Sequence, residues 1–342
     1  MCQSRCVYCD IWKVAEKNPK LIDREMKFEE IKNYFLRDKD FLNQLEFVQL
    51  TGGEPLLKAD IEKLAELCYK VSSKLESLWI PSNGLATSLV VKKVQMMIEN
   101  PEIKKVGVSL SIDGQEKYHD KVRGRRGFFK KTKKTIKNLV KMKEGTNKLE
   151  LSLGFTIGSE NWKDLMFAYK MSKEFGIDFT TRPVNFSEVY YLNTNERPNI
   201  GLNQNEIAEI EKILKDLESK MLKDKTYLQG LNTKIYLRGI LRYLNGPFER
   251  FFPCYSGSLS LAIDPLGNVF PCLYMSEKLG NIRENRLEDI WKSKKAGEVW
   301  KRINKGLCPN CWVECESQKN ITYELPRVLK NFKFKSPERP SP

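Results

Sequence analysis

Five short apolar segments, rich in β-branched and aromatic residues, alternate with amphipathic segments in the first half of the chain. In the first amphipathic segment, residues 61–71, apolar side chains recur at helical spacing. Strands that alternate with helices predict a parallel α/β sheet or barrel. The five expected strands are residues 47–51, 78–81, 106–112, 151–157 and 178–183.

Each expected strand ends in small, polar or turn residues. In parallel α/β folds the chemistry collects at the carboxyl ends of the strands. We therefore expect the functional groups of this half of the chain to meet at one edge of the sheet. The strand ends are Thr51-Gly52-Gly53-Glu54, Ser82-Asn83-Gly84, Asp113-Gly114, Gly158-Ser159 and Asn185.

Three of the nine cysteines, Cys2, Cys6 and Cys9, lie in the first nine residues. A closed structural zinc site takes four ligands, and a disulfide takes cysteines in pairs. Three thiolates on one short loop instead suit a metal centre that keeps one position open for another molecule.

The composition describes a globular chain of 342 residues and 39.8 kDa, large enough for one large domain and a smaller one. No stretch approaches the roughly 20 apolar residues of a membrane span, and no secretory signal precedes the cysteines. We expect a cytoplasmic protein, where cysteines are more often metal ligands or catalytic thiols than disulfides.

The chain is basic, with 59 Lys and Arg against 44 Asp and Glu. Such an excess favours nucleic acid, an acidic membrane face or an acidic substrate, or is a lysine-rich solvated surface. The basic run at 130–134 has no Arg/aromatic pattern typical of RNA platforms, so the solvated surface is favoured. The single histidine, His119, is expected at the surface near a helix start.

The spacing of Cys2, Cys6 and Cys9, with Tyr8 before the last cysteine, resembles the signature of the radical S-adenosylmethionine (SAM) superfamily. The segment Thr51-Gly-Gly-Glu-Pro, after the next expected strand, is similar to the family's GGE motif. The resemblance implies that the three cysteines ligate a [4Fe-4S] cluster whose fourth iron binds SAM. It also implies that Gly52, Gly53 and Glu54 contact the methionine part of SAM.

Further positions resemble family residues that contact SAM at the ends of the following strands. An arginine of the family pairs with the SAM carboxylate, and a guanidinium fork fits that group well. The positions implied as SAM contacts are Ser82, Asn83, Ser109, Ser111, Asp113 and Arg123.

The resemblance implies a partial (β/α)6 TIM-like barrel followed by a small cysteine-rich α+β domain. In the family the cluster loop follows a first β-strand, and here only Met1 precedes Cys2. We therefore expect a truncated or mis-started sequence that lacks this strand. The expected division is a radical SAM core at 1–195, a helical bridging segment at 196–250, an auxiliary iron–sulfur domain at 251–320 and a basic tail at 321–342.

Five further cysteines lie in the last hundred residues. A predicted hairpin around Gly267 folds Cys254 and Cys272 toward each other, and a zinc site with four sulfurs is one interpretation of this region. The C-x12-G-x4-C hairpin and Gly280-Asn-Ile resemble the SPASM/twitch extension of radical SAM enzymes. That resemblance implies one auxiliary [4Fe-4S] cluster. Its ligands would be Cys254, Cys272 and two of Cys308, Cys311 and Cys315.

Cys68 is left over, and its place in an apolar stripe predicts a core thiol. No side chain is assigned as a catalytic acid, base or nucleophile. The resemblance places the chemistry in the cofactor: SAM is cleaved reductively to a 5′-deoxyadenosyl radical, which abstracts a hydrogen atom. A low-potential electron donor such as ferredoxin or flavodoxin is implied as a partner.

The leading hypothesis is an oxidoreductase that modifies a C–H bond on a peptide or protein side chain. Alternatives within the class are a small-molecule dehydrogenase, an enzyme of cofactor biosynthesis, and an RNA-modifying enzyme. An alternative from another class is a zinc-binding interaction protein. A nucleic-acid partner is not favoured, and no membrane span is expected.

Overall fold

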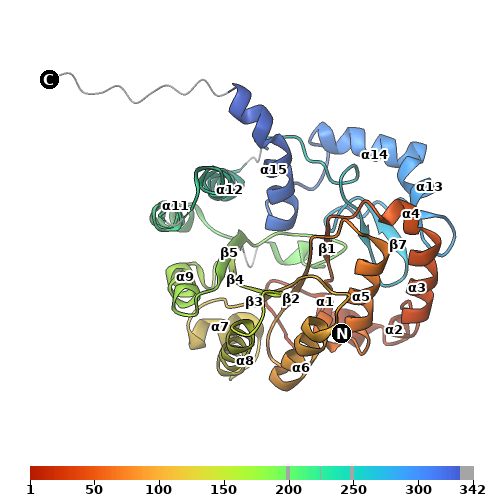
Figure 1. Ribbon diagram of the computed structural model, residues 1–342. Helices are drawn as coiled ribbons and strands as arrows, with labels where there is room; N and C mark the ends of the chain where they lie inside the picture. The colour runs from red at the N-terminus through yellow and green to blue at the C-terminus, as the bar shows by residue number, and fades with distance from the viewer. Residues whose placement is uncertain (198–200, 224, 247–249, 332–342) are drawn as a thin grey trace.

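The structure is a computed structural model that describes residues 1–197, 201–223, 225–246 and 250–331. Within these residues the first half of the chain forms one sheet of five parallel strands, in the order β1-β2-β3-β4-β5 (Figure 1). This curled, open sheet with helical crossovers is the predicted partial TIM-like barrel. The strands are β1 (Phe47–Gln49), β2 (Ser77–Ser82), β3 (Val106–Ser111), β4 (Leu149–Ile157) and β5 (Asp178–Pro183).

Amphipathic helices connect the strands and cover one face of the sheet (Figure 1). The predicted helix at 61–71 is confirmed as α5 (Ile61–Val71), and its buried residues include Ala65 and Cys68. Cys68 is 1% exposed, as expected for a core thiol. The remaining crossover helices are α6 (Thr87–Glu99), α7 (Glu116–Arg123), α8 (Phe128–Lys143) and α9 (Leu165–Glu174).

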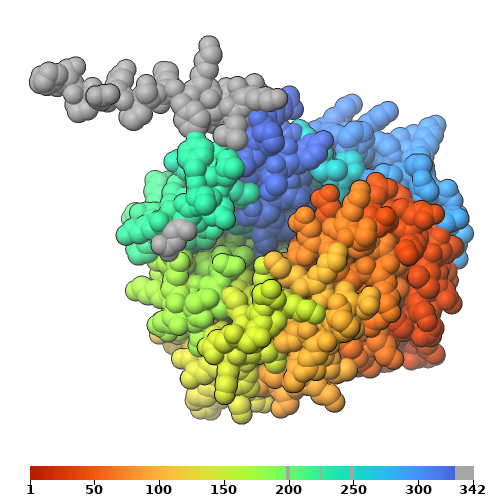
Figure 2. Space-filling model, in the orientation of Figure 1, coloured from red at the N-terminus to blue at the C-terminus, as the bar shows by residue number. Residues whose placement is uncertain are grey.

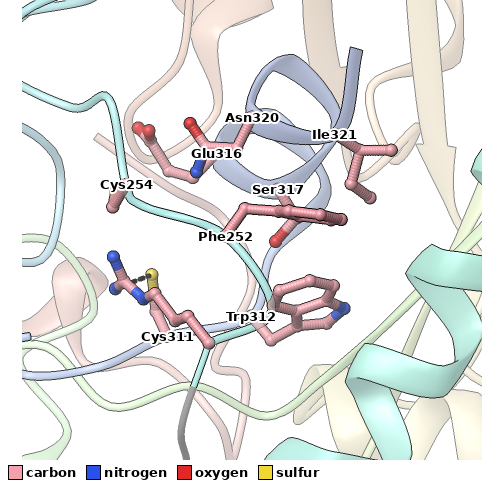
Figure 3. A pocket seen from close by; sticks show the side chains of 9 residues that line it. Phe252, Cys254, Cys311, Trp312, Glu316, Ser317, Asn320 and Ile321 are labelled. Carbon is pink, nitrogen blue, oxygen red and sulfur yellow. Dashed lines mark hydrogen bonds between the residues drawn. The ribbon is translucent and has the colours of Figure 1, made fainter. Parts of the chain in front are cut away.

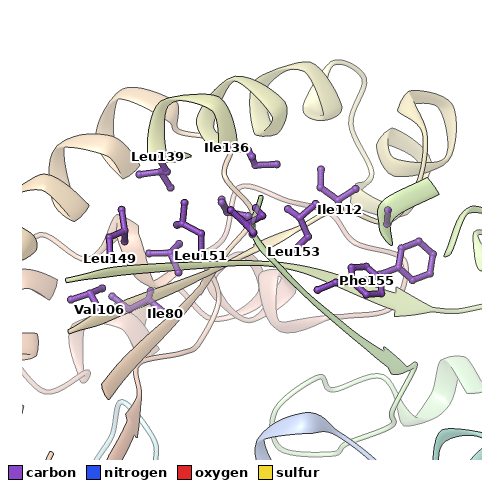
Figure 4. Packing of buried hydrophobic residues seen from close by; sticks show 14 of the residues in the cluster. Ile80, Val106, Ile112, Ile136, Leu139, Leu149, Leu151, Leu153 and Phe155 are labelled. Atoms are coloured by element: carbon purple, nitrogen blue, oxygen red, sulfur yellow. The ribbon is translucent and has the colours of Figure 1, made fainter. Parts of the chain in front are cut away.

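The main core lies between the sheet and these helices. Ile136 and Leu139 of α8 point toward the sheet, where Leu151 and Leu153 of β4 meet them, and all four side chains are at most 1% exposed (Figure 4). Burial of apolar surface of this kind stabilises the folded state by about 25 cal/mol per Å². The packing fixes the strands in register and therefore fixes the positions of their carboxyl ends.

Four short helices precede the sheet: α1 (Ile11–Lys17), α2 (Lys20–Asp23), α3 (Phe28–Arg37) and α4 (Lys39–Leu42). After the sheet, α11 (Gln204–Met221) begins at a capping box formed by Asn203 and Glu206, and buries Ile207, Ile210, Leu214 and Leu217. This helix lies within the expected helical bridging segment at 196–250. It packs against α12 (Tyr227–Asn245).

The cysteine-bearing unit has a small antiparallel sheet, β6 (Ala262–Ile263), β7 (Asn268–Phe270) and β8 (Gly280–Asn281). The predicted hairpin is the β6–β7 pair, with Gly267 at φ +84° in its turn. Three helices follow: α13 (Leu287–Lys292), α14 (Lys294–Asn304) and α15 (Glu314–Asn331). Residues 321–331 of the expected basic tail therefore belong to α15.

Parts of two expected domains lie outside the described residues. They are 332–342 of the basic tail, and 198–200, 224 and 247–249 of the bridging segment. None of the described helices is both long enough and apolar enough to cross a membrane.

A second core joins the N-terminal helices to the cysteine-bearing unit. Met26, Ile31 and Leu42 form one buried cluster with Val269 and Ile282. Figure 2 shows the corresponding red and blue segments in contact along one side of the molecule. Ion pairs border the cluster, between Arg283 and Glu30 and between Arg286 and Asp38. The N-terminal helices and the cysteine-bearing unit therefore share one core.

Trp312, in the segment before α15, packs directly on α12. Its indole stacks on Tyr236 and donates a hydrogen bond to the Tyr236 carbonyl oxygen over 2.8 Å. This close approach requires glycine at 239, because an added Cβ would lie 1.9 Å from the indole. Gly297, in α14, has no atom within 4 Å of the corresponding position.

We predict that Gly239→Ala destabilises the protein by about 1–3 kcal/mol, because the indole must move out of a packed site. The matched change Gly297→Ala is expected to be neutral or stabilising by up to ~1 kcal/mol, since alanine is the better helix former. Thermal unfolding midpoints of the two variants test this. Equal midpoints would contradict the proposed packing of Trp312 on α12.

Candidate functional site

The N-terminal cysteine loop lies across the carboxyl ends of the strands. Its first contact is with the turn after β1, where the Glu54 amide donates a hydrogen bond to the Met1 carbonyl oxygen over 2.9 Å. A Cβ at Gly53 would lie 2.4 Å from that oxygen. The second glycine of the Gly-Gly-Glu turn is therefore needed for the close approach of this loop.

The end of α7 holds the middle of the loop. The amides of Arg5 and Val7 donate hydrogen bonds to the carbonyl oxygens of Arg123 and Val122, each over 2.9 Å. Gly124 ends α7 in the left-handed region, at φ +73°, and a Cβ there would lie 2.2 Å from the Arg5 carbonyl oxygen. These contacts fix the backbone on both sides of Cys6.

Tyr8 anchors the loop to the end of β4. The side chain is 6% exposed and packs on Gly158, and its hydroxyl accepts a hydrogen bond from the Glu160 amide over 3.2 Å. The same hydroxyl donates to Asn161 over 3.3 Å. A tyrosine before the third cysteine thus fixes the position of Cys9 relative to the sheet.

The loop and the strand ends enclose a cavity of about 170 Å³. It brings together the three N-terminal cysteines and all but one of the positions implied as SAM contacts. Ser109 is the exception, since its hydroxyl lies beside Gly154 within the sheet. The predicted residues that line the cavity are Cys2, Cys6, Cys9, Gly52, Gly53, Glu54, Ser82, Asn83, Ser111, Asp113 and Arg123.

Glu54 is the buried carboxylate of this cavity, with a residue exposure of 4%. It accepts hydrogen bonds from the Asn83 amide over 2.7 Å and from the Ser82 hydroxyl over 2.9 Å. Burial raises the pKa of Glu54 to about 6, although these hydrogen bonds oppose the rise. A bound cation such as an ammonium group would stabilise its charged form.

Asp113, at the end of β3, organises the opposite side of the cavity. Its carboxylate forms a buried ion pair with Arg123 at 2.5 Å and accepts a hydrogen bond from the Thr156 amide. Its backbone amide donates to Nδ1 of His119 over 3.1 Å, and its carbonyl oxygen accepts from Asn161. Every polar group of Asp113 is therefore used to hold the neighbouring elements in place.

Two side chains that line the cavity donate hydrogen bonds to cysteine sulfurs. Arg123 Nη1 lies 3.6 Å from Cys6 Sγ, and Asn83 Nδ2 lies 3.9 Å from Cys2 Sγ. Donors of this kind orient thiolate ligands and tune the metal that they hold. Three thiols beside an open cavity, two of them with such donors, fit a thiolate-ligated cluster with one free position.

Burial raises the pKa of Cys6 and raises that of Cys9 to about 12. Ligation requires the thiolate, so cluster binding must release protons from these thiols. Among the residues that the structure describes, no three Cys, His, Asp or Glu side chains form a group that could hold a single metal ion.

The C-terminal cysteines fall into two environments. Cys254 and Cys311 line a small cavity with Glu316 (Figure 3), and burial raises the pKa of Cys272 to about 12. Cys254, Cys272 and Cys311 are all less than 9% exposed. Cys315 instead lines the large cavity, together with the cysteines of the N-terminal loop. Cys308 is half-buried.

Several cavity residues were not predicted from the sequence. Arg182 of β5 forms an ion pair with Glu314, the residue before Cys315, and both line the large cavity. Tyr190 shares a hydrogen bond with Thr51 over 2.5 Å, and Tyr191 and Tyr274 pack edge to face. Each looked like an ordinary strand or loop residue in the sequence, because the contact is made across a long separation in the chain.

The prediction for His119 is wrong. It is completely buried in α7, because its ring packs on Phe129 and its Nδ1 accepts from the Asp113 amide. The amphipathic pattern of α7 gave no sign of this hydrogen bond to the end of β3.

Two models of known protein families match the sequence of this chain. The family model of the radical SAM superfamily matches residues 1–172, which is half of the chain, and the SPASM iron–sulfur cluster-binding domain matches residues 254–316. The chain belongs to the radical SAM superfamily. It is therefore a radical SAM enzyme with a SPASM domain, and it uses a [4Fe-4S] cluster, SAM and auxiliary iron–sulfur chemistry.

Two curated relatives illustrate the range of the family. The chain is 26% identical, over 285 residues, to the AdoMet-dependent heme synthase of Methanosarcina barkeri (strain Fusaro / DSM 804). The aligned region covers 77% of this chain and 73% of the relative. It is 37% identical, over 92 residues, to the sporulation killing factor maturation protein SkfB of Bacillus subtilis (strain 168), covering 27% of this chain and 20% of the relative.

Solved structures share the fold. Native anSMEcpe with bound AdoMet superposes with a TM-score of 0.61 at 20% identity, covering 96% of this chain and 95% of that one. The same protein with bound AdoMet and the Kp18Cys peptide gives a TM-score of 0.59. These likenesses support the partial barrel and the attached cysteine-bearing unit as one architecture.

We predict a pH dependence of stability from His119. Burial lowers the pKa of His119 to about 4, against 6.5 in an exposed chain, so the unfolded state binds the proton first as the pH falls. The neutral, buried His119 thus contributes its full stabilisation above pH ~6.5. This contribution is lost progressively as the pH falls from ~6.5 to ~4. Between about pH 7.5 and pH 5.5 the loss is about 1 kcal/mol.

His119→Asn should remove this loss, because the Asn oxygen can still accept from the Asp113 amide but does not titrate. Urea unfolding of both proteins under argon at the two pH values measures the difference. His119 is the only histidine of the chain, so the difference reports this residue. Parallel pH profiles would contradict the burial of a neutral His119.

Proposed function

We propose that this chain is an oxidative radical SAM enzyme that modifies a C–H bond of a peptide or protein side chain. The observation that carries the proposal is one cavity lined both by the N-terminal cysteines and by Cys315 of the C-terminal unit. A substrate held there would lie between the SAM site and the auxiliary iron–sulfur unit.

In this proposal Cys2, Cys6 and Cys9 hold the first cluster, which together with SAM supplies hydrogen-atom abstraction when bound. Glu54 would receive the SAM amino group, since it is a buried carboxylate whose hydrogen-bond donors among the described residues, on Leu56, Ser82 and Asn83, carry no charge. Arg123 would pair with the SAM carboxylate, while Asp113 and the end of α7 keep its guanidinium in place. Ser82, Asn83 and Ser111, which line the cavity, remain proposed SAM contacts, whereas Ser109 does not line it.

The auxiliary cluster would be held by Cys254, Cys272 and Cys311, with the fourth thiolate from Cys308 or Cys315. The first three are buried in one cluster of side chains. The cluster would accept one electron from the substrate radical that hydrogen-atom abstraction leaves, and the radical would thereby become the oxidised product. A low-potential donor such as ferredoxin or flavodoxin would supply the electron that starts each turnover.

The part of the large cavity lined by Glu314 favours binding of a peptide-like substrate group. One oxygen of Glu314 is bonded to Arg182, and the other, Oε2, is buried with no partner among the described residues. A buried carboxylate oxygen without a donor costs about 1–3 kcal/mol or more. A backbone amide or an ammonium group of a substrate would supply that donor, and Tyr190, Tyr191 and Tyr274 would enclose it.

Relatives give further support through their own activities. SkfB is a maturation protein for a killing factor, and AlbA of Bacillus subtilis (strain 168) is a bacteriocin biosynthesis protein, 21% identical over 303 residues and covering 87% of this chain. The second candidate function is small-molecule chemistry. It is favoured by the heme synthase and by a GTP 3′,8-cyclase of Aliarcobacter butzleri (strain RM4018) that covers 89% of this chain.

Anaerobic reconstitution tests the cofactor assignment. We expect about eight irons per chain from two four-iron clusters, and 5′-deoxyadenosine release with dithionite and SAM. Cys6→Ala should abolish this release, while Cys272→Ala should lower the iron content and leave release intact. Cys68→Ala is the matched control, since that thiol lies in the core and should affect neither. Continued release from Cys6→Ala would contradict the assignment.

The substrate class is tested on the same reconstituted enzyme. Cysteine-containing synthetic peptides are compared with a porphyrin and with GTP by mass spectrometry after incubation with dithionite and SAM. Loss of two hydrogen atoms or a new crosslink in a peptide supports the proposal. Turnover of the porphyrin or of GTP, with no modified peptide, would replace it with the second candidate function.

A further inference from the structure

Arg250 lies four residues before Cys254, outside the residues matched by the SPASM domain. Its side chain nevertheless reaches the C-terminal thiols. Nη2 lies 3.3 Å from Cys308 Sγ and 4.0 Å from Cys311 Sγ. One guanidinium thus contacts two of the five C-terminal cysteines, and it lines the same small cavity as Cys254.

The positive charge of Arg250 is not used elsewhere in the part of the chain that the structure describes. Its Nη1 is buried and has no hydrogen-bond partner there. The buried carboxylate of the same cavity, Glu316, is already paired with Lys319 and bonded to Ser256. A permanent charge buried among thiols, with one donor still unpaired, is costly unless a negative group occupies the cavity.

A cluster ligated by four thiolates is such a negative group. Each electron that it accepts adds negative charge, and a cation a few ångströms away stabilises the more negative state. Net charge, hydrogen bonds to sulfur and solvent exposure are the levers by which a protein sets the reduction potential of an iron–sulfur cluster. Arg250 acts on the first two of these properties, since its guanidinium is positively charged and donates to two sulfurs.

We propose that Arg250 is a positioning residue of the auxiliary cluster, whose buried charge raises the reduction potential of that cluster and helps to retain it. The inference rests on the proposed function, because it requires iron at the C-terminal cysteines. A raised potential makes the auxiliary cluster a better acceptor for an electron from a substrate radical, which is oxidised to the product by losing it. The residue thus favours the oxidative direction of the reaction.

The test uses the full chain with Cys2, Cys6 and Cys9 changed to Ala, so that only the auxiliary cluster contributes a signal. Into this parent are placed Arg250→Gln, Arg250→Lys and the control Arg302→Gln. Arg302 lies on α14 of the same unit, about half exposed and paired with Glu277. Iron content is measured first, then the midpoint potential by EPR during titration with dithionite.

We expect Arg250→Gln to lower the equilibrium constant for cluster reduction at least tenfold, ~59 mV for a one-electron couple. It should also shorten the lifetime of the cluster in the presence of an iron chelator. Arg250→Lys, which keeps the charge, should retain most of the parental potential. Arg302→Gln should match the parent in both measurements.

The outcomes separate this inference from the function on which it depends. A parent without iron would overturn the auxiliary cluster itself. Iron in the parent with equal potentials in Arg250→Gln would overturn only the role of Arg250. An equal shift in Arg302→Gln, or loss of iron in both Arg250 variants, would also overturn it, because the effect would then not follow the buried charge.

Discussion

The buried ion pair between Asp113 and Arg123 is the interaction on which the SAM half of the cavity depends. Asp113 is fixed by the end of β3, and Arg123 by the last turn of α7. The same turn hydrogen-bonds the backbone of the cysteine loop, and the guanidinium reaches Cys6. This one salt bridge therefore fixes the position of the cysteine loop relative to the sheet. Because both groups are buried, removal of either partner would leave an uncompensated charge, which costs about 3–5 kcal/mol in such pairs.

The cavity is completed from both ends of the chain. The sheet supplies its floor through the turns after β1, β2 and β3, whereas Glu314 and Cys315 form the opposite wall. The ion pair of Arg182 with Glu314 ties the last parallel strand to α15. A site assembled in this way keeps reactive groups away from water on several sides, which radical chemistry requires. The second core, which holds the N-terminal helices against the cysteine-bearing unit, fixes the distance between the two walls.

Local patterns predicted the fold and the first half of the site well. Short β-branched segments located all five parallel strands, and the spacing of Cys2, Cys6 and Cys9 with the Gly-Gly-Glu turn identified the family. These features are encoded within a few residues of each other. The failures involve contacts between distant segments. His119 is buried because it caps the end of a strand, and Arg182 and Glu314 meet across 132 positions of sequence. No periodicity records such pairings, and a single sequence offers no covariation to reveal them.

The second core also determines which segments of this chain could be exchanged with a relative in a chimaera. Sequence matching divides the chain into two modules at 1–172 and 254–316, yet Met26, Ile31 and Leu42 of the first are buried by residues of the second. Burying an aliphatic side chain of this size is worth roughly 1.5–3 kcal/mol. A chimaera that swapped the C-terminal module alone would present these three side chains to a surface that did not evolve against them. The transferable unit is the C-terminal module together with residues 26–42, which include helices α3 and α4 and lie more than two hundred residues earlier in the chain.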